Sequence, residues 1–227
     1  MKPQKWGKTA ILFDLDGTLV DTVYQHVCSW SAALKREGVI IPAWKIHRRI
    51  GMSGSAMVRQ LLREQGFRTK IDIAVLEKRH DDAFIKSSRD ASVLPGAREL
   101  LKFLTKRHVL WAIATTGNKE QTARLLRKFS IPASVPVVTG DDVVKAKPSP
   151  EVFVLAADRL GRPIADCIVT GDSVWDVVAA ARKRALGVGL LSGGYSREEL
   201  AGAGAFRVYA DPADMLQHIE DLGMETW

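Results

Sequence analysis

Two aspartates, Asp14 and Asp16, follow the short apolar run of residues 10–13. An apolar run that ends in turn residues predicts a buried strand. Because side chains alternate along a strand, both carboxylates emerge on the same side where the strand ends. Two adjacent carboxylates repel each other unless a cation or a shared proton compensates. The pair therefore predicts a functional site, although Asp-Gly, here Asp16-Gly17, is also a common surface turn.

Polar residues also follow three later predicted strands. Thr115, Thr116, Gly117 and Asn118 follow the strand expected over 109–114. Lys147 follows the strand expected over 135–139, and Asp172 and Asp176 follow the strand expected over 167–170. Open parallel sheets bind ligands beyond the carboxyl ends of their strands, so we expect these residues to converge at one edge.

Oxygen ligands dominate this set. Asp14, Asp172 and Asp176 offer the hard carboxylate oxygens that Mg²⁺ prefers, with water and substrate completing its coordination. No group of histidines and cysteines has the spacing of a transition-metal site, which disfavours zinc. The expected cofactor is therefore Mg²⁺.

The same edge can also hold an anion. Thr115 and the amides of Thr116 and Gly117 stand at the start of a predicted helix, where backbone N–H groups bind anions. Lys147 adds a positive charge. A divalent cation, a lysine and helix amides together suit a phosphoryl group.

Strands that alternate with helices position these residues and predict an α/β fold, a parallel sheet with helices on both faces. Two further strands are expected over 186–191 and 206–209. Residues 23–88 show helical spacing and no convincing strand. The four expected helices there cover 23–37, 44–50, 55–65 and 73–88. We therefore expect a helical insertion after the first strand.

Composition indicates an ordinary globular protein, with 46% hydrophobic and 26% charged residues among 227. No apolar stretch could span a bilayer, and the basic start precedes too few apolar residues for a signal peptide. Cys28 and Cys167 lie far apart and are expected to be reduced core residues. A cytoplasmic protein without membrane contact is therefore expected.

The net charge of +7 is concentrated in one segment, because residues 21–91 hold 13 lysines and arginines against 8 acidic residues. Any single one of these basic residues is best explained as part of a solvated face. Together they would attract a small anionic metabolite to a nearby site. Nucleic acid is a weaker alternative, because aromatic residues are not interleaved with the basic ones.

The sequence resembles the haloacid dehalogenase (HAD) superfamily, in its phosphoglycolate phosphatase and β-phosphoglucomutase-like branch. Four segments carry the resemblance in the family's order: Asp14-Leu15-Asp16-Gly17-Thr18-Leu19-Val20-Asp21-Thr22, Thr115, Lys147-Pro148-Ser149-Pro150-Glu151, and Gly171-Asp172-Ser173-Val174-Trp175-Asp176. The resemblance implies a Rossmann-like catalytic core formed by residues 1–20 and 92–227. It also implies an inserted all-α helical-bundle cap over residues 21–91.

The resemblance also implies a phosphatase mechanism. Asp14 attacks phosphorus to form an aspartyl-phosphate, and Asp16 acts as general acid and then general base. Mg²⁺ is held by Asp14, the backbone carbonyl of Asp16 and Asp172.

The remaining motif residues have supporting roles in this scheme. Thr115, Thr116 and Gly117 hold the phosphoryl oxygens, and Lys147 stabilises charge and restrains Asp14. Asp176 orients metal-bound water or Lys147, or is simply an acidic residue at a helix start.

Relatives with other chemistries differ at single positions. Dehalogenases and phosphonatases lack the acid at Asp16, which argues against both. Sugar-phosphate mutases keep it and place a basic residue in the cap loop, where this sequence has Gly54. Arg48 and Arg49 lie close enough in sequence to replace that residue. A phosphatase is therefore favoured, with a mutase as the alternative and a non-catalytic basic binding module behind both.

Substrate selection is expected from the cap, which offers His26, Arg48, Arg49, Met52 and His80 as residues that could face the site. His26 lies where related caps have a histidine near the hinge, and fits a packed helix histidine equally well. The sequence leaves the substrate, the breadth of specificity and the oligomeric state open.

Overall fold

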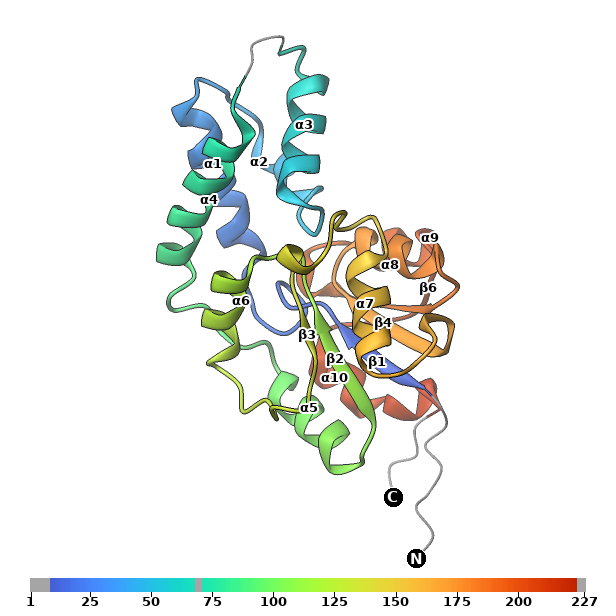
Figure 1. Ribbon diagram of the computed structural model, residues 1–227. Helices are drawn as coiled ribbons and strands as arrows, with labels where there is room; N and C mark the ends of the chain where they lie inside the picture. The colour runs from blue at the N-terminus through green and yellow to red at the C-terminus, as the bar shows by residue number, and fades with distance from the viewer. Residues whose placement is uncertain (1–8, 68–70, 224–227) are drawn as a thin grey trace, which may run out of the picture.

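Six parallel strands form the centre of the protein in a computed structural model that describes residues 9–67 and 71–223 (Figure 1). The strands are β1 (Ala10–Phe13), β2 (Leu110–Ala114), β3 (Val137–Val138), β4 (Cys167–Gly171), β5 (Leu186–Leu190) and β6 (Ala205–Tyr209). Their order in the sheet is β3-β2-β1-β4-β5-β6, and each neighbouring pair is parallel. The predicted α/β fold is confirmed.

Helices cover both faces of this sheet. They are α5 (Ala97–Lys106), α6 (Lys119–Leu126), α7 (Glu151–Arg159), α8 (Val174–Ala181), α9 (Arg197–Gly202) and α10 (Pro212–Gln217), with 3₁₀ turns at Gly140–Asp142, Ile164–Asp166, Leu191–Gly193 and Ile219–Leu222. Alternation along β1 divides the core: Ile11 and Phe13 share a cluster with α5, α6 and α10. Ala10 and Leu12 pack on the other face against α7 and α8.

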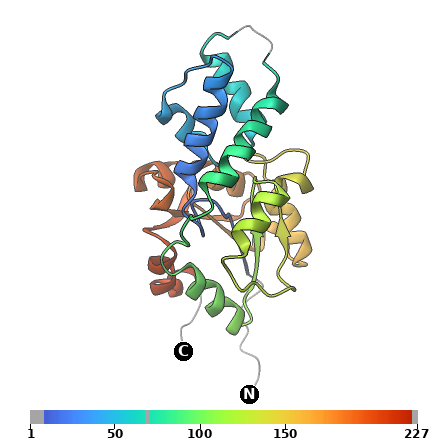
Figure 2. The same ribbon diagram turned by 90° about the vertical axis from the view of Figure 1, so that its left-hand side faces the viewer.

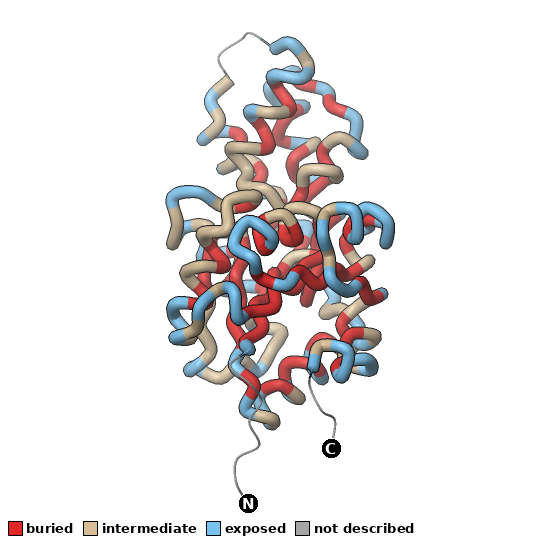
Figure 3. The backbone as a smooth tube through the Cα atoms, turned by 90° about the vertical axis from the view of Figure 1, so that its right-hand side faces the viewer, coloured by how far each residue is buried: buried red, intermediate tan, exposed pale blue. Residues whose placement is uncertain are grey.

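Four helices are inserted between β1 and α5 and form a separate layer above the sheet (Figure 2). They are α1 (Val23–Arg36), α2 (Ala43–His47), α3 (Gly54–Glu64) and α4 (Ile73–Ser87). We call this layer the cap. Val23, Val27, Trp30 and Leu34 recur at helical spacing on α1 and are buried in the cap's own core. Figure 3 shows buried segments both in the sheet and between the cap helices.

The chain enters and leaves the cap through two paired segments. Val20 and Val93 form an antiparallel bridge. The amide of Asp21 donates to the carbonyl of Ser92 at 2.9 Å, and the amide of Leu94 donates to the carbonyl of Leu19 at 3.0 Å. The two connections therefore lie side by side.

Some expectations differ from the structure. The expected helix over 44–50 ends at His47, and α9 was not predicted. Both cysteines are free, but the expectation that both are core residues is wrong for Cys28, which is exposed on α1, whereas Cys167 is buried. Within the described ranges, no helix is long and apolar enough to cross a membrane.

Candidate active site

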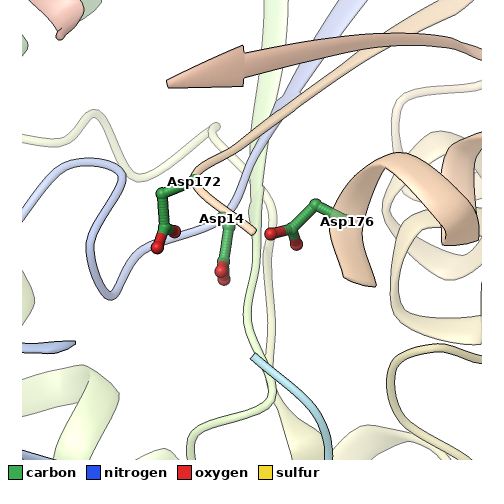
Figure 4. Close-up of side chains that lie close together, drawn as sticks. All are labelled: Asp14, Asp172 and Asp176. Carbon is green, nitrogen blue, oxygen red and sulfur yellow. The ribbon is translucent and has the colours of Figure 1, made fainter. Parts of the chain in front are cut away.

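Three buried carboxylates converge at the carboxyl edge of the sheet, as the strand-end pattern predicts. Asp14 follows β1, Asp172 follows β4, and Asp176 lies in the first turn of α8. One oxygen from each lies within 4.8 Å of the others. Figure 4 shows Asp172 and Asp176 on either side of Asp14, with the carboxyl group of Asp176 pointing toward Asp14.

Lys147 joins two of these carboxylates. Its Nζ lies 2.7 Å from Oδ1 of Asp14 and 2.8 Å from Oδ1 of Asp176, and its side chain is completely buried. Asp176 also caps α8. Its Oδ2 accepts hydrogen bonds from the backbone amide of Ser173 at 3.1 Å and from the Ser173 hydroxyl at 2.6 Å. Asp176 thus lies at a helix start and contacts Lys147, while its role in orienting Lys147 or metal-bound water stays a prediction.

Negative charge exceeds positive charge in this cluster. Burial, opposed by Lys147, raises the pKa of Asp14 to about 7. Burial, then Asp176 and Asp14, raise the pKa of Asp172 well above its usual value. Burial disfavours the Lys147 ammonium, but Asp14 and Asp176 outweigh it and hold the pKa of Lys147 above its usual value. A divalent cation would neutralise the remaining charge, and the all-oxygen donor set fits Mg²⁺.

The Asp16 side chain does not belong to this carboxylate cluster. Its Oδ1 accepts the Thr22 hydroxyl at 2.6 Å and lies 3.2 Å from Nε2 of His26, and its Oδ2 lies 3.5 Å from Oγ1 of Thr115. Burial alone would raise the pKa of Asp16, but His26 and Thr22 outweigh it and the pKa is lowered. Only the backbone carbonyl of Asp16 was expected to bind Mg²⁺, and that contact stays a prediction.

Two cap histidines extend from Asp16 into the cap. Nδ1 of His26 lies 3.0 Å from Nε2 of His80, and Nδ1 of His80 lies 2.9 Å from Oδ1 of Asp81. His26 therefore links Asp16 to His80, and His80 links it onward to Asp81. The ring of Phe84 stacks on His26 at 3.8 Å and fixes its orientation.

The predicted phosphate cradle lies beside Asp16. Thr115 is buried at the end of β2, and its Oγ1 accepts the amide of Gly117 at 3.1 Å. Asn118 then caps α6, because its Oδ1 accepts the amide of Gln121 at 2.9 Å. Thr116 and Gly117 line the same cavity as Asp14, while their binding of phosphate stays a prediction.

A cavity of about 350 Å³ separates core and cap above these residues. Asp14, Asp16 and Thr116 line its core side, and His80, Ser53 and Glu77 line its cap side. Its volume is in the range of sites for small molecules. A ligand there would contact Asp14 and the cap at once.

The cap residues expected to face the site divide into two groups. His26, Met52 and His80 line the cavity. The structure places Arg48 and Arg49 outside it, because Arg48 pairs with Glu199 on the core and Arg49 with Glu64 on the cap. Their charges are therefore used in ion pairs that hold the fold, which sequence spacing did not reveal.

Arg48 instead helps to dock the cap on the core. Its carbonyl accepts the indole N–H of Trp175 at 3.2 Å and the hydroxyl of Tyr195 at 2.7 Å. Its guanidinium lies 4.0 Å over the Tyr195 ring. Nearby, Nε2 of His47 lies 2.8 Å from the carbonyl oxygen of Gly193.

Sequence reasoning missed several residues around Asp172. The Thr18 hydroxyl donates to Oδ1 of Asp172 at 2.8 Å. Gly17 has φ +75°, and a Cβ there would lie 2.4 Å from Oδ2 of Asp172, so only glycine lets this carboxylate approach. Both residues belong to the first motif, but nothing in their spacing indicates a contact with a residue so distant in sequence.

Comparison with known proteins agrees with this geometry. The family model of haloacid dehalogenase-like hydrolases matches residues 8–182. Hexitol phosphatase A of Escherichia coli (strain K12) is 32% identical over 71% of this chain and 73% of its own. Phosphoglycolate phosphatase of Rhodospirillum rubrum is 28% identical over 91% of this chain and 88% of its own.

A solved structure extends the comparison. A hydrolase from Pseudomonas syringae superposes with a TM-score of 0.91 at 44% identity, covering 94% of this chain and 99% of the other. The region that the family model matches, residues 8–182, includes the carboxylates, the lysine and the cap described above. The chain therefore belongs to the haloacid dehalogenase-like hydrolases.

Proposed function

We propose that this protein is a Mg²⁺-dependent phosphomonoester hydrolase that acts through an aspartyl-phosphate on Asp14. It is a HAD-family phosphatase, as its relatives are. The observation that carries the proposal is the pair formed by Asp14 and Lys147 at the floor of the cavity, with Asp16 set apart from it. This arrangement separates a nucleophile from an acid.

In the first step, a carboxylate oxygen of Asp14 attacks phosphorus, and the bond from phosphorus to the ester oxygen breaks. Asp16 gives its proton to the departing alkoxide. In the second step, Asp16 takes a proton from water as that water attacks phosphorus. This releases inorganic phosphate and frees Asp14.

Lys147 has two tasks in this scheme. Its two ion pairs keep the Asp14 carboxylate oriented, and its charge stabilises the negative oxygens that develop on the phosphoryl group. Asp14 and Asp172, with the backbone carbonyl of Asp16, would hold Mg²⁺. That ion would neutralise charge between nucleophile and phosphate.

Hydrolysis is favoured over the mutase alternative by the cap loop at Gly54. A Cβ at Gly54 would lie 2.8 Å from Cζ2 of Trp30, so a longer side chain has no room. Oε1 of Glu77 lies 3.4 Å from the same point. The place where a mutase has a basic residue therefore faces an acidic one, and Arg48 and Arg49 are engaged elsewhere.

Release of inorganic phosphate from a panel of phosphorylated metabolites tests the proposal. We expect turnover that requires Mg²⁺ and that falls by about a thousandfold or more in Asp14→Asn. Asp16→Asn should lose about 10²–10⁴-fold while it still binds Mg²⁺, because its side chain lies outside the carboxylate cluster.

Four results would contradict the proposal. Turnover that persists in EDTA would show that the reaction does not require Mg²⁺. Turnover at full rate in Asp14→Asn would show that Asp14 is not the nucleophile. Isomerisation primed by a bisphosphate, without net phosphate release, would favour the mutase. Salt-sensitive binding of nucleic acid by a protein without turnover would favour the basic binding module.

A further inference from the structure

We propose that the cavity selects monophosphates with an uncharged, hydroxyl-rich leaving group, and that Glu77 rejects substrates with a second anionic group. The inference rests on the phosphatase function proposed above and specifies its substrate class. It concerns the cap end of the cavity, opposite Asp14.

Glu77 lies where the far end of a substrate would be. It projects from α4 into the cavity that also contains Asp14. Its Oε1 is 3.4 Å from the position a Cβ of Gly54 would occupy, which places the carboxylate against the cap loop. Glu77 is half-buried, so solvent screens its charge only in part.

Arg59 partly offsets the charge of Glu77, but it lies outside the cavity lining. Among the residues that line the cavity in the described part of the chain, none is a lysine or arginine. The other two acids at the cap end and mouth, Asp81 and Asp141, already accept hydrogen bonds from Gln121 at 2.7 Å and from the amide of Lys119 at 2.8 Å. A substrate carboxylate or second phosphate would therefore meet negative charge without a lysine or arginine partner in the lining.

Hydroxyl groups, by contrast, find partners there. The backbone amide of Ser55 acts on the Glu77 carboxylate and lowers its pKa, and the carboxylate retains further acceptor capacity, since each of its oxygens has two lone pairs. Ser53 and Ser55 contribute hydroxyls to the cavity lining. Met52 and Trp30 supply apolar surface for a carbon skeleton. This mixture suits a polyol or a neutral sugar.

Substrate pairs that differ in one group test the inference. D-Glucitol 6-phosphate and 6-phosphogluconate share a six-carbon chain and differ only in a terminal hydroxymethyl or carboxylate. 2-Hydroxyethyl phosphate and phosphoglycolate form the corresponding two-carbon pair. We expect kcat/KM to favour the hydroxymethyl member by about tenfold or more, most strongly in the longer pair, which reaches Glu77.

Glu77→Gln tests the assigned residue because it keeps the shape and removes the charge. We expect the preference for D-glucitol 6-phosphate over 6-phosphogluconate to fall about tenfold, mainly through faster turnover of the anionic member. Asp82→Asn is the matched control. It makes the same charge change on the same helix, but Asp82 is exposed and lies outside the cavity lining, so the preference should persist.

The outcomes separate the two proposals. If no phosphomonoester is hydrolysed, the phosphatase function fails. If both members of each pair are hydrolysed equally well, the phosphatase function stands and the substrate class is wrong. If wild type shows the preference and folded Glu77→Gln retains it, Glu77 is not the discriminating residue. If Glu77→Gln does not fold, the salt dependence of the wild-type preference replaces it as the test. A preference that stays the same as salt is raised from 0.05 to about 0.5 M would contradict a charge-based selection.

Discussion

Asp14 and Asp16 are two residues apart, but their surroundings shift their pKa values in opposite directions. Burial raises the pKa of Asp14 to about 7, whereas His26 and Thr22 lower the pKa of Asp16. These shifts are opposite to the roles of nucleophile and acid, so the bound ions must reverse them. Mg²⁺ beside Asp14 would lower the pKa of Asp14, and a phosphate dianion beside Asp16 would raise the pKa of Asp16. The histidine pair from the cap supplies part of this difference, so the chemistry depends on residues outside the core.

His80 predicts a pH dependence of stability. Burial lowers its pKa to about 4 in the folded protein, against 6.5 when it is solvated. Between these values the unfolded chain binds more protons at His80, so the stability it contributes is complete above pH 6.5 and is lost as pH falls toward 4. His26 and Asp81 contact His80 and are present in both proteins compared below.

The measurement is urea denaturation of wild type and His80→Gln at pH 7.5 and 4.5. The wild type should lose about 2–3 kcal/mol more unfolding free energy between these two pH values than the variant does. Equal losses in the two proteins would show that His80 is not held neutral.

The sequence predicted those site residues that lie at the carboxyl ends of strands. Asp14, Thr115, Lys147 and Asp172 all follow strands, and parallel strands end at one edge. The contact between His26 and His80 depends instead on how α1 packs on α4, which no local spacing reports. His26 and His80 are 54 positions apart in the sequence, so only the tertiary structure shows that they are in contact.

At the level of elements, the segment after α2 joins cap and core. The Arg48 carbonyl accepts two hydrogen bonds from core side chains, Trp175 and Tyr195, and the amide of Ser53 donates to the carbonyl of Lys147 at 3.1 Å. Displacement of this segment would change the cavity and the surroundings of Lys147 together. Opening of the cap is therefore expected to begin here.

Tyr195→Phe removes one of these links and nothing from the cavity lining. Loss of one hydrogen bond costs about 0.5–1.5 kcal/mol, so the ratio of docked to open cap should fall by about two- to tenfold. Amide hydrogen exchange over residues 46–53 should accelerate, and KM should rise.

Tyr209→Phe is the control, since the Tyr209 hydroxyl is buried on β6 without a hydrogen-bond partner among the residues described. It should leave exchange in the cap unchanged. If Tyr195→Phe does the same, the segment does not hold the cap.

Short elements show the limit of prediction from sequence. The strand over 10–13 was placed correctly, because four apolar residues end abruptly at aspartate. Helix α9 has only six residues, too few for periodicity to emerge. Its capping box, Ser196 with Glu199, was the available signal.

Across the whole molecule, the positive charge is distributed differently from the expectation of a basic lid over an anion site. The net charge is +7, yet the described lining of the cavity contains no lysine or arginine. Arg48, Arg49 and Arg79 of the cap form ion pairs with glutamates. Excess positive charge can still draw anions toward the protein, while selection occurs inside the cavity.

Binding of Mg²⁺ should stabilise the whole protein, because the ion offsets repulsion among Asp14, Asp172 and Asp176. At a free concentration of one hundred times Kd, the gain is about 2.7 kcal/mol, which corresponds to about 5–10 °C in Tm for a chain of this size. Thermal melts with Mg²⁺ and with EDTA measure it.

Asp172→Asn should lose most of this difference, whatever its own Tm, because it removes one of the oxygen ligands. A wild-type Tm that is the same in Mg²⁺ and in EDTA would mean that the carboxylates do not bind the ion.

The paired connections at Val20 and Val93 have a consequence for how such proteins diversify. Because entry and exit are bridged to each other, the chain connects the whole helical layer to the sheet at one place. Exchanging it for the corresponding layer of a relative would leave every strand of the sheet continuous. New specificities can thus be grafted onto an unchanged cluster of Asp14, Lys147 and Asp172 by altering one contiguous stretch of the gene, provided that the new layer keeps the histidine contact to Asp16.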